Sequence, residues 1–128
     1  MKLVLDSGGV SALAGHRARL AELRRRDLWP PLVPAVVLTE ALTGNHRRDF
    51  HANRLLGMCQ VKPVDEPLAR QAAVLRTNTG TAGTISATDA IVVALAGTVR
   101  DANVLTSDPA DLSALAAESE GTIAITAV

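Results

Sequence analysis

Four acidic residues of this 128-residue chain lie in or beside apolar runs that are typical of buried strands and helices. They are Asp6, Glu40, Asp89 and Asp108. A carboxylate among apolar residues is costly to bury unless a positive charge or hydrogen bonds compensate it. Carboxylates that gather in one place repel one another, so either some become protonated or a cation binds. Mg²⁺ and Mn²⁺ prefer oxygen ligands and support the hydrolysis of phosphodiesters.

Each of these acids also has an ordinary structural explanation. Asp6 ends an apolar run, at a place where turns favour Asp, and Glu40 fits an exposed helix position. Asp89 is expected in the first turn of a helix, where the helix dipole favours a negative charge. Asp108 stands where a helix cap is expected. Only their joint placement predicts a site.

Strands and helices alternate along the chain, and this pattern predicts an α/β fold. The expected strands are residues 2–5, 32–33, 59–64, 103–106 and 122–128, and the expected helices are 10–15, 17–26, 35–43, 47–57, 66–76, 87–99 and 109–118. Such alternation implies one domain over residues 1–128, with a central, mainly parallel sheet and helices on both faces. Ligands of such sheets bind beyond the carboxyl ends of the strands. All four acids can reach that edge.

Composition and charge narrow the function classes. Residues 16–54 carry eight Arg against four acids, a balance of +4, whereas residues 55–128 carry four basic and eight acidic residues, a balance of −4. This asymmetry suggests an anionic partner for the first half, although solvated helix faces explain it equally well. Aromatic residues are limited to Trp29 and Phe50, which argues against a base-stacking platform. Phe50 is expected on the apolar side of its helix.

The sequence gives little support for a disulfide, a zinc site, a membrane span or a signal peptide. Cys59 is the only cysteine, so no intrachain disulfide can form, and its apolar neighbours indicate a core position. A zinc site is not indicated, because His46 and His51 are five residues apart and no thiol accompanies them. No apolar run approaches the roughly 18 residues of a membrane span, and no signal peptide is recognisable. We therefore expect a soluble, cytoplasmic protein without membrane association.

Four segments, in order, resemble the motifs of PIN-domain ribonucleases and, within that group, of the VapC toxins of bacterial toxin–antitoxin pairs. The segments are LVLDS, PAVVLTEALTG, ATDAIVVALA and NVLTSDPADL. The resemblance implies a PIN-like three-layer fold and Mg²⁺- or Mn²⁺-dependent endoribonuclease activity. It also implies an RNA substrate, a cognate antitoxin and a homodimer. Asp6, Glu40, Asp89 and Asp108 would be the catalytic, metal-binding acids.

Details around these motifs remain open. Gly8 and Gly9 follow Asp6 where the family more often carries Thr or Ser followed by Ser or Ala, so we expect a loose turn there. Asp111 follows Asp108 by about one helical turn, and we expect Asp108 to be the ligand and Asp111 to support it. The residue next to the last acid, Thr106 or Ser107, resembles the family's small polar residue.

The neighbours of the acids suggest further roles. The arginines expected to bind RNA phosphates beside the acids are Arg24, Arg25, Arg26, Arg47 and Arg48. Ser7, Thr39 and Thr43 are candidates for hydrogen bonds to the acids. Three alternatives stay open: a non-catalytic PIN-like module that binds RNA or protein, a phosphatase or phosphoacceptor with Asp6 as nucleophile, and a serine hydrolase. The last lacks a G-x-S-x-G motif.

Overall fold

Strand β1 (Lys2–Leu5) forms the middle of the sheet in the computed structural model, which describes residues 1–128. Its apolar residues Leu3, Val4 and Leu5 are almost fully buried. The sheet has the order β3-β2-β1-β4-β5, and every pair of neighbours is parallel. The other strands are β2 (Leu32–Pro34), β3 (Gln60–Lys62), β4 (Asp101–Thr106) and β5 (Thr122–Ala127). The carboxyl ends of all five strands therefore lie at the same end of the sheet, as the sequence predicted.

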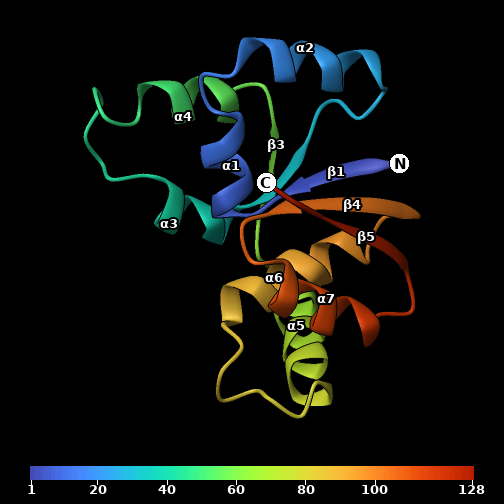
Figure 1. The fold of residues 1–128 in the computed structure, drawn as a ribbon. Helices are drawn as coiled ribbons and strands as arrows, with labels where there is room; N and C mark the ends of the chain where they lie inside the picture. Colours follow the sequence, from blue (N-terminus) through green and yellow to red (C-terminus); the bar gives the residue numbers. More distant parts are fainter.

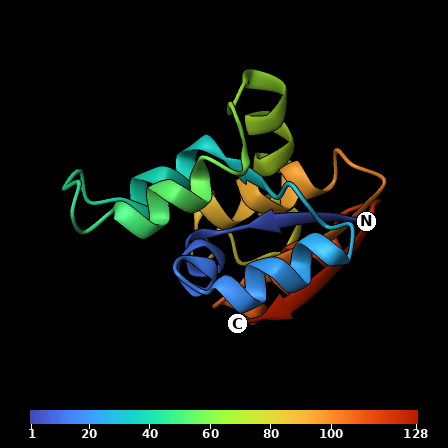
Figure 2. The same ribbon diagram turned by 90° about the horizontal axis from the view of Figure 1, so that it is seen from above.

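Helices cover both faces of this sheet (Figure 1). On one face lie α1 (Ser7–Leu13), α2 (Arg17–Arg25) and α4 (Phe50–Leu56). On the other lie α5 (Glu66–Asn78), α6 (Ala87–Ala96) and α7 (Pro109–Ala117). A 3₁₀ turn, η1 (Ala35–Val37), and the short helix α3 (Leu38–Ala41) follow β2. The view from above shows α3 and α4 extending past the sheet toward one side (Figure 2). The predicted α/β arrangement of three layers, with a parallel sheet between helices, is confirmed (Figure 1).

Helix α6 is the main buried helix of the structure. Six of its ten residues are buried, namely Ala90, Val92, Val93, Ala94, Leu95 and Ala96. A helix that is apolar on nearly all sides needs neighbours on nearly all sides, and α6 contacts β1, β2, β4, α5 and α7. Ser86 caps its start by accepting a hydrogen bond of 3.1 Å from the backbone N–H of Asp89. The core packing of α6 thus fixes where Asp89 stands.

Several predicted boundaries differ from the observed ones for identifiable reasons. Helix α1 begins at Ser7 rather than at residue 10 because Asp6 caps it directly. Helix α4 begins at Phe50 rather than at residue 47, since the Asn45 side chain turns the chain by accepting from the N–H groups of Arg47 and Arg48. Strand β3 ends at Lys62, before Pro63, whose nitrogen cannot donate to a ladder.

The predicted surroundings of Phe50 were wrong. Its side chain is 52% exposed, whereas Leu55 and Leu56 of the same helix are buried. Phe50 opens α4, ahead of the part of the helix that contacts the core. No helix in the structure combines the length and apolar character needed to cross a bilayer.

Candidate metal centre

The carboxylate of Asp6 is held between helix α1 and strand β4. Its Oδ1 accepts a hydrogen bond of 2.7 Å from the backbone N–H of Gly9, and this bond caps α1. Its Oδ2 accepts a hydrogen bond from the hydroxyl of Thr106. The Thr106 oxygen in turn accepts from the backbone N–H of Asp108 at 2.9 Å. Asp6 and Thr106 are both buried, so this chain of bonds links the ends of two neighbouring strands and orients both acids.

Three further acids converge at the same edge of the sheet. Asp89 lies in the first turn of α6, Asp108 is the N-cap residue of α7, and Asp111 lies in the first turn of α7. One carboxylate oxygen from each lies within 4.8 Å of the other two. Asp108 is exposed and the other two are half-buried, so this group of oxygens is open to water on one side.

This arrangement raises the pKa of Asp89 and of Asp111. Burial is the largest cause for Asp89 and the charge of Asp108 is the next, so the pKa of Asp89 rises to about 6 although a hydrogen bond to Ser86 opposes the rise. The charges of Asp6 and Asp111 add to the effect. Burial and the charge of Asp108 likewise raise the pKa of Asp111. A cation among these oxygens would remove the repulsion, and an all-oxygen, half-open donor set suits a hard ion that keeps some of its waters.

Glu40 does not belong to this group of three acids. It is exposed on α3, and it lines an open hollow of about 520 Å³ together with Ser7, Gly8 and Ser107. Ser107 immediately precedes Asp108, so the hollow adjoins the three acids. Glu40 therefore lies at the predicted end of the sheet, but across this hollow from the three acids. The four-acid site stays a prediction, in which Glu40 is the outlying member.

The family follows from the chain's match to known domains. The PIN domain matches residues 4–118, which is most of the chain. The chain belongs to the PIN-domain family. No curated protein matches the chain at a significant level.

The fold of this PIN domain is also found in solved structures of low sequence identity. The DNA-bound VapBC of Salmonella typhimurium has a TM-score of 0.72 at 16% identity, over 99% of this chain and 98% of the other. FitAcB of Neisseria gonorrhoeae has a TM-score of 0.64 at 22% identity, over 95% and 96%. PAE2754 of Pyrobaculum aerophilum has 0.63 at 17%, over 97% and 83%. The predicted family resemblance is confirmed at the level of the PIN domain.

The role of Asp111 in the site of this PIN domain was underestimated from the sequence alone. We expected it only to support Asp108, yet the structure places both in the same group of converging oxygens. The signal was present in the spacing, because a helix brings residues three apart to the same side. Either acid can therefore serve as the ligand from α7.

Thr106 connects the acids of this PIN domain, and its removal gives a direct test of the hydrogen-bond chain. Thr106→Val keeps the shape of the side chain but leaves Oδ2 of Asp6 without its donor and the Asp108 N–H without its acceptor. We expect the free energy of unfolding to fall by about 1–3 kcal/mol, the usual effect of leaving buried polar groups unpaired. Urea denaturation would measure it. Thr106→Ser keeps the hydroxyl and should lose less, and equal losses in both variants would contradict this role.

The glycines after Asp6 are not a loose turn, and that prediction was wrong. Both lie inside α1, which packs against the end of β4. A Cβ on Gly8 would come within 2.6 Å of the Ser107 Cβ, and one on Gly9 would overlap with the backbone oxygen of Leu105. Glycine is required here because the helix backbone approaches the neighbouring strand closely.

Two of the three predicted hydrogen-bonding neighbours have other partners. The hydroxyl of Thr39 donates to the backbone oxygen of Val36 at 2.7 Å, within its own turn. The hydroxyl and N–H of Thr43 donate to the carboxylate of Asp49 at 2.9 and 3.0 Å, and the Gly44 N–H adds a bond of 2.8 Å. These bonds, the Thr43 N–H foremost, lower the pKa of Asp49. Sequence reasoning did not single out Asp49, a buried acid that fixes the loop after α3.

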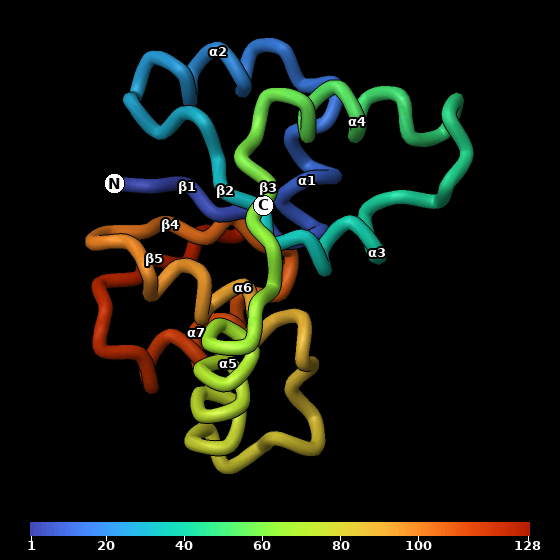
Figure 3. The backbone as a smooth tube through the Cα atoms, turned by 180° about the vertical axis from the view of Figure 1, so that it is seen from behind, coloured from blue at the N-terminus to red at the C-terminus, as the bar shows by residue number.

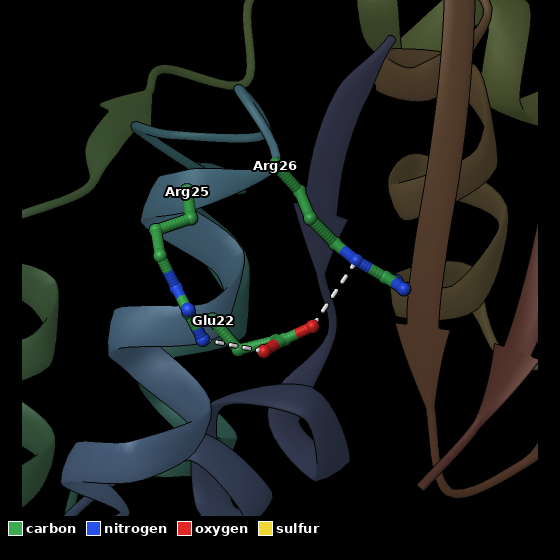
Figure 4. Close-up of polar contacts among 3 residues, drawn as sticks. All are labelled: Glu22, Arg25 and Arg26. Atoms are coloured by element: carbon green, nitrogen blue, oxygen red, sulfur yellow. Dashed lines mark hydrogen bonds and ion pairs between the residues drawn. The ribbon is translucent and has the colours of Figure 1, made fainter.

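The arginines at the end of α2 lie away from the acids of the PIN domain. Helix α2 ends beside the chain's N-terminus, where β1 begins, whereas the acids follow the strand ends (Figures 1 and 3). Arg25 and Arg26 pair with Glu22 at 2.8 and 3.3 Å on the helix surface (Figure 4). The prediction that Arg24, Arg25 and Arg26 stand beside the acidic centre was therefore wrong. In a parallel sheet, the helix that precedes a strand must return the chain to the end of the sheet where the strands begin. The arginines at the end of α2 therefore lie at that end, opposite the acids.

Cys59 plays no part in the site. It is half-buried behind α4, and its thiol donates to the backbone oxygen of Leu55 at 3.2 Å. Burial raises the pKa of the Cys59 thiol to about 11. Since the thiolate is the nucleophilic form, a thiol with such a pKa is unreactive near neutral pH.

Proposed function

We propose that this PIN domain is a metal-dependent endoribonuclease of the VapC toxin type, which hydrolyses RNA phosphodiester bonds. The observation that carries the proposal is the convergence of Asp89, Asp108 and Asp111 beside the anchored Asp6, within a chain of the PIN family. The fold likeness to VapBC and FitAcB is consistent with it. Attack by water on the phosphorus, with cleavage of the bond from phosphorus to the 3′-oxygen and protonation of that oxygen, would give a 5′-phosphate and a 3′-hydroxyl.

The residues that would hold the ion are Asp6, Asp89 and Asp108, with Asp111 and Glu40 on either side. A bound Mg²⁺ or Mn²⁺ would supply positive charge that activates a water and offsets the charge of the phosphate. Within the chain, Thr106 and the Gly9 N–H keep the Asp6 carboxylate fixed, so no reorientation is needed during the reaction. The Ser7 and Ser107 side chains line the hollow beside the acids, where hydroxyls could donate to phosphate oxygens.

The proposal includes two protein partners. We propose that an antitoxin inhibits the enzyme by placing a basic residue at the acids. The positive charge of an arginine or lysine there would offset the repulsion between the carboxylates, as a bound metal ion would. We also propose a homodimer, following the resemblance to VapC toxins. Both would be visible as defined complexes in multi-angle light scattering after co-expression.

The decisive experiment is cleavage of defined tRNA and rRNA fragments with Mg²⁺, Mn²⁺ or EDTA. We expect cleavage with either ion, none with EDTA, and a loss of about a hundredfold or more in Asp6→Asn, since even groups that support a metal ligand contribute 10–100-fold. Asp101→Asn is the matched control, because Asp101 is exposed at the opposite end of β4. Full activity in Asp6→Asn would contradict the site. RNA binding that EDTA leaves unchanged, without any cleavage, would favour a non-catalytic module.

A further inference from the structure

A small basic pocket lies on the opposite end of α1 from the acids. It is formed where the turn after α1 and the start of α2 meet α4, and its volume is about 90 Å³. Its lining consists of Gly15, Arg17, Leu20, His51, Arg54, Leu55 and Met58. Since a water occupies about 30 Å³ in the liquid, the pocket has room for a group the size of one phosphate.

The charges at this pocket are not neutralised within the chain. Arg17 and Arg54 are exposed and form no ion pair, in contrast to Arg25, Arg26 and Arg70. No acidic residue lines the pocket. Two unpaired guanidinium groups beside an imidazole, around a hollow of this size, suit an anion with several acceptor oxygens.

An exposed aromatic ring stands next to this pocket. The ring of Phe50 lies edge-on to that of His51 with centroids 5.2 Å apart, and the Arg54 guanidinium is 5.9 Å from the Phe50 centroid. Phe50 is the only exposed aromatic residue of the chain and has no core neighbour to explain it. An exposed ring beside phosphate-binding arginines is the combination with which proteins hold single-stranded nucleic acid, because the base stacks while its backbone is neutralised.

The pocket is also at a useful distance from the acids. Helix α1 has seven residues and begins at the acids, so at 1.5 Å per residue its far end is about 10 Å away. About three nucleotides of a stacked strand span that length at 3.4 Å each. Figure 1 shows α1 leading from the sheet edge to the point where α2 and α4 meet.

We infer that Arg17, His51 and Arg54 bind a backbone phosphate of single-stranded RNA about three nucleotides from the cleaved bond, with an adjacent base stacked on Phe50. This inference rests on the proposed ribonuclease function for its substrate. It makes the α1–α2–α4 junction, rather than Arg25 and Arg26 at the end of α2, the positive surface that compensates the acids' repulsion of RNA. Phosphate binding should dominate affinity, and stacking should add to it without sequence preference.

The test measures RNA binding apart from cleavage. Fluorescence anisotropy of a labelled ten-nucleotide RNA is followed in EDTA, with every protein carrying Asp89→Asn so that no cleavage occurs. We expect Arg17→Gln with Arg54→Gln to weaken binding about tenfold or more and to reduce the slope of log K against log salt by about 0.7, the value for the one phosphate that is no longer neutralised. Phe50→Leu should weaken binding about fivefold or more with an unchanged salt slope.

The matched control is Arg19→Gln with Arg100→Gln, which removes the same charge from two exposed, unpaired arginines outside the pocket. Equal effects of this control and the pocket variant would overturn the inference, as would binding of hexaglutamate at the pocket as tight as that of RNA. If the wild type cleaves RNA but the pocket variants bind RNA as tightly as the unsubstituted pocket does, the role of the pocket is refuted and the nuclease function is not. Pocket-dependent binding by a wild type that never cleaves would refute the nuclease alone.

Discussion

Asp89→Asn is expected to abolish RNA cleavage and, in the absence of metal, to make the protein more stable near neutral pH. The loss of activity should reach about a hundredfold or more, because the substitution removes a charge from the group of converging acids. The gain in stability has the same origin. Asp89 must ionise in a half-buried place near the charges of Asp108, Asp6 and Asp111, and asparagine has no charge to place there.

The direction of the pH dependence follows from the raised pKa. Asp89 titrates at about 6 in the folded state and near 3.8 when unfolded, so between these values the folded state binds more protons. The stability of the metal-free wild type must then fall as the pH rises from about 4 to 6. The full difference in pKa corresponds to about 3 kcal/mol, and solvent screening of this half-exposed group reduces it to on the order of 1 kcal/mol.

Thermal unfolding in EDTA from pH 4 to 8 would measure this effect. The variant's advantage in Tm should grow across that range by about 3–5 °C, as expected for a domain of this size. A pH-independent offset, such as the lost interaction with the α6 dipole, would not alter this trend. Mg²⁺ at pH 8 should raise the Tm of the wild type and have less effect on the variant. A constant difference between the proteins at every pH would contradict the proposed repulsion.

The local pattern was enough to predict the edge of the sheet at which the acids gather. Asp6 follows β1 directly and Asp108 lies two residues beyond the end of β4. Because parallel strands end together, the topology alone places the two acids near each other. Ser86 and the apolar run after it likewise determined the place of Asp89. Glu40 could not be placed in the same way, because a 3₁₀ turn and a four-residue helix separate it from β2.

The positions of the arginines, of Phe50 and of the basic pocket on the surface could not be inferred from the sequence pattern, because they depend on how separate helices pack together. A run of arginines in sequence indicates charge but not the edge at which a helix ends, and α2 carries Arg25 and Arg26 away from the acids. Phe50 resembled a core residue in composition, yet it precedes the buried part of α4. The basic pocket combines residues from two helices and a turn, so only the assembled layer reveals it.

Gly9→Ala is expected to destabilise the protein by about 1–3 kcal/mol or more, although alanine favours helices by up to about 1 kcal/mol over glycine. Gly9 lies in α1, where the added Cβ would overlap with the backbone oxygen of Leu105 and come within 3.3 Å of a Leu5 methyl carbon. A backbone atom in the middle of a parallel sheet cannot move aside as a flexible side chain can. Relief of the overlap must push α1 away from β4, and this movement would separate Asp6 from Thr106.

Gly83→Ala provides the matched control, since no atom lies within 4 Å of the Cβ position and the backbone there is not in the left-handed region. We expect that control to change stability by no more than about 0.5 kcal/mol and to retain cleavage. Urea denaturation and cleavage of the same RNA fragments would be measured on both proteins. If Gly9→Ala were as stable and active as Gly83→Ala, the close approach of α1 to β4 would not be what positions Asp6, and its orientation would depend only on the hydrogen bonds from the backbone N–H of residue 9 and the Thr106 hydroxyl.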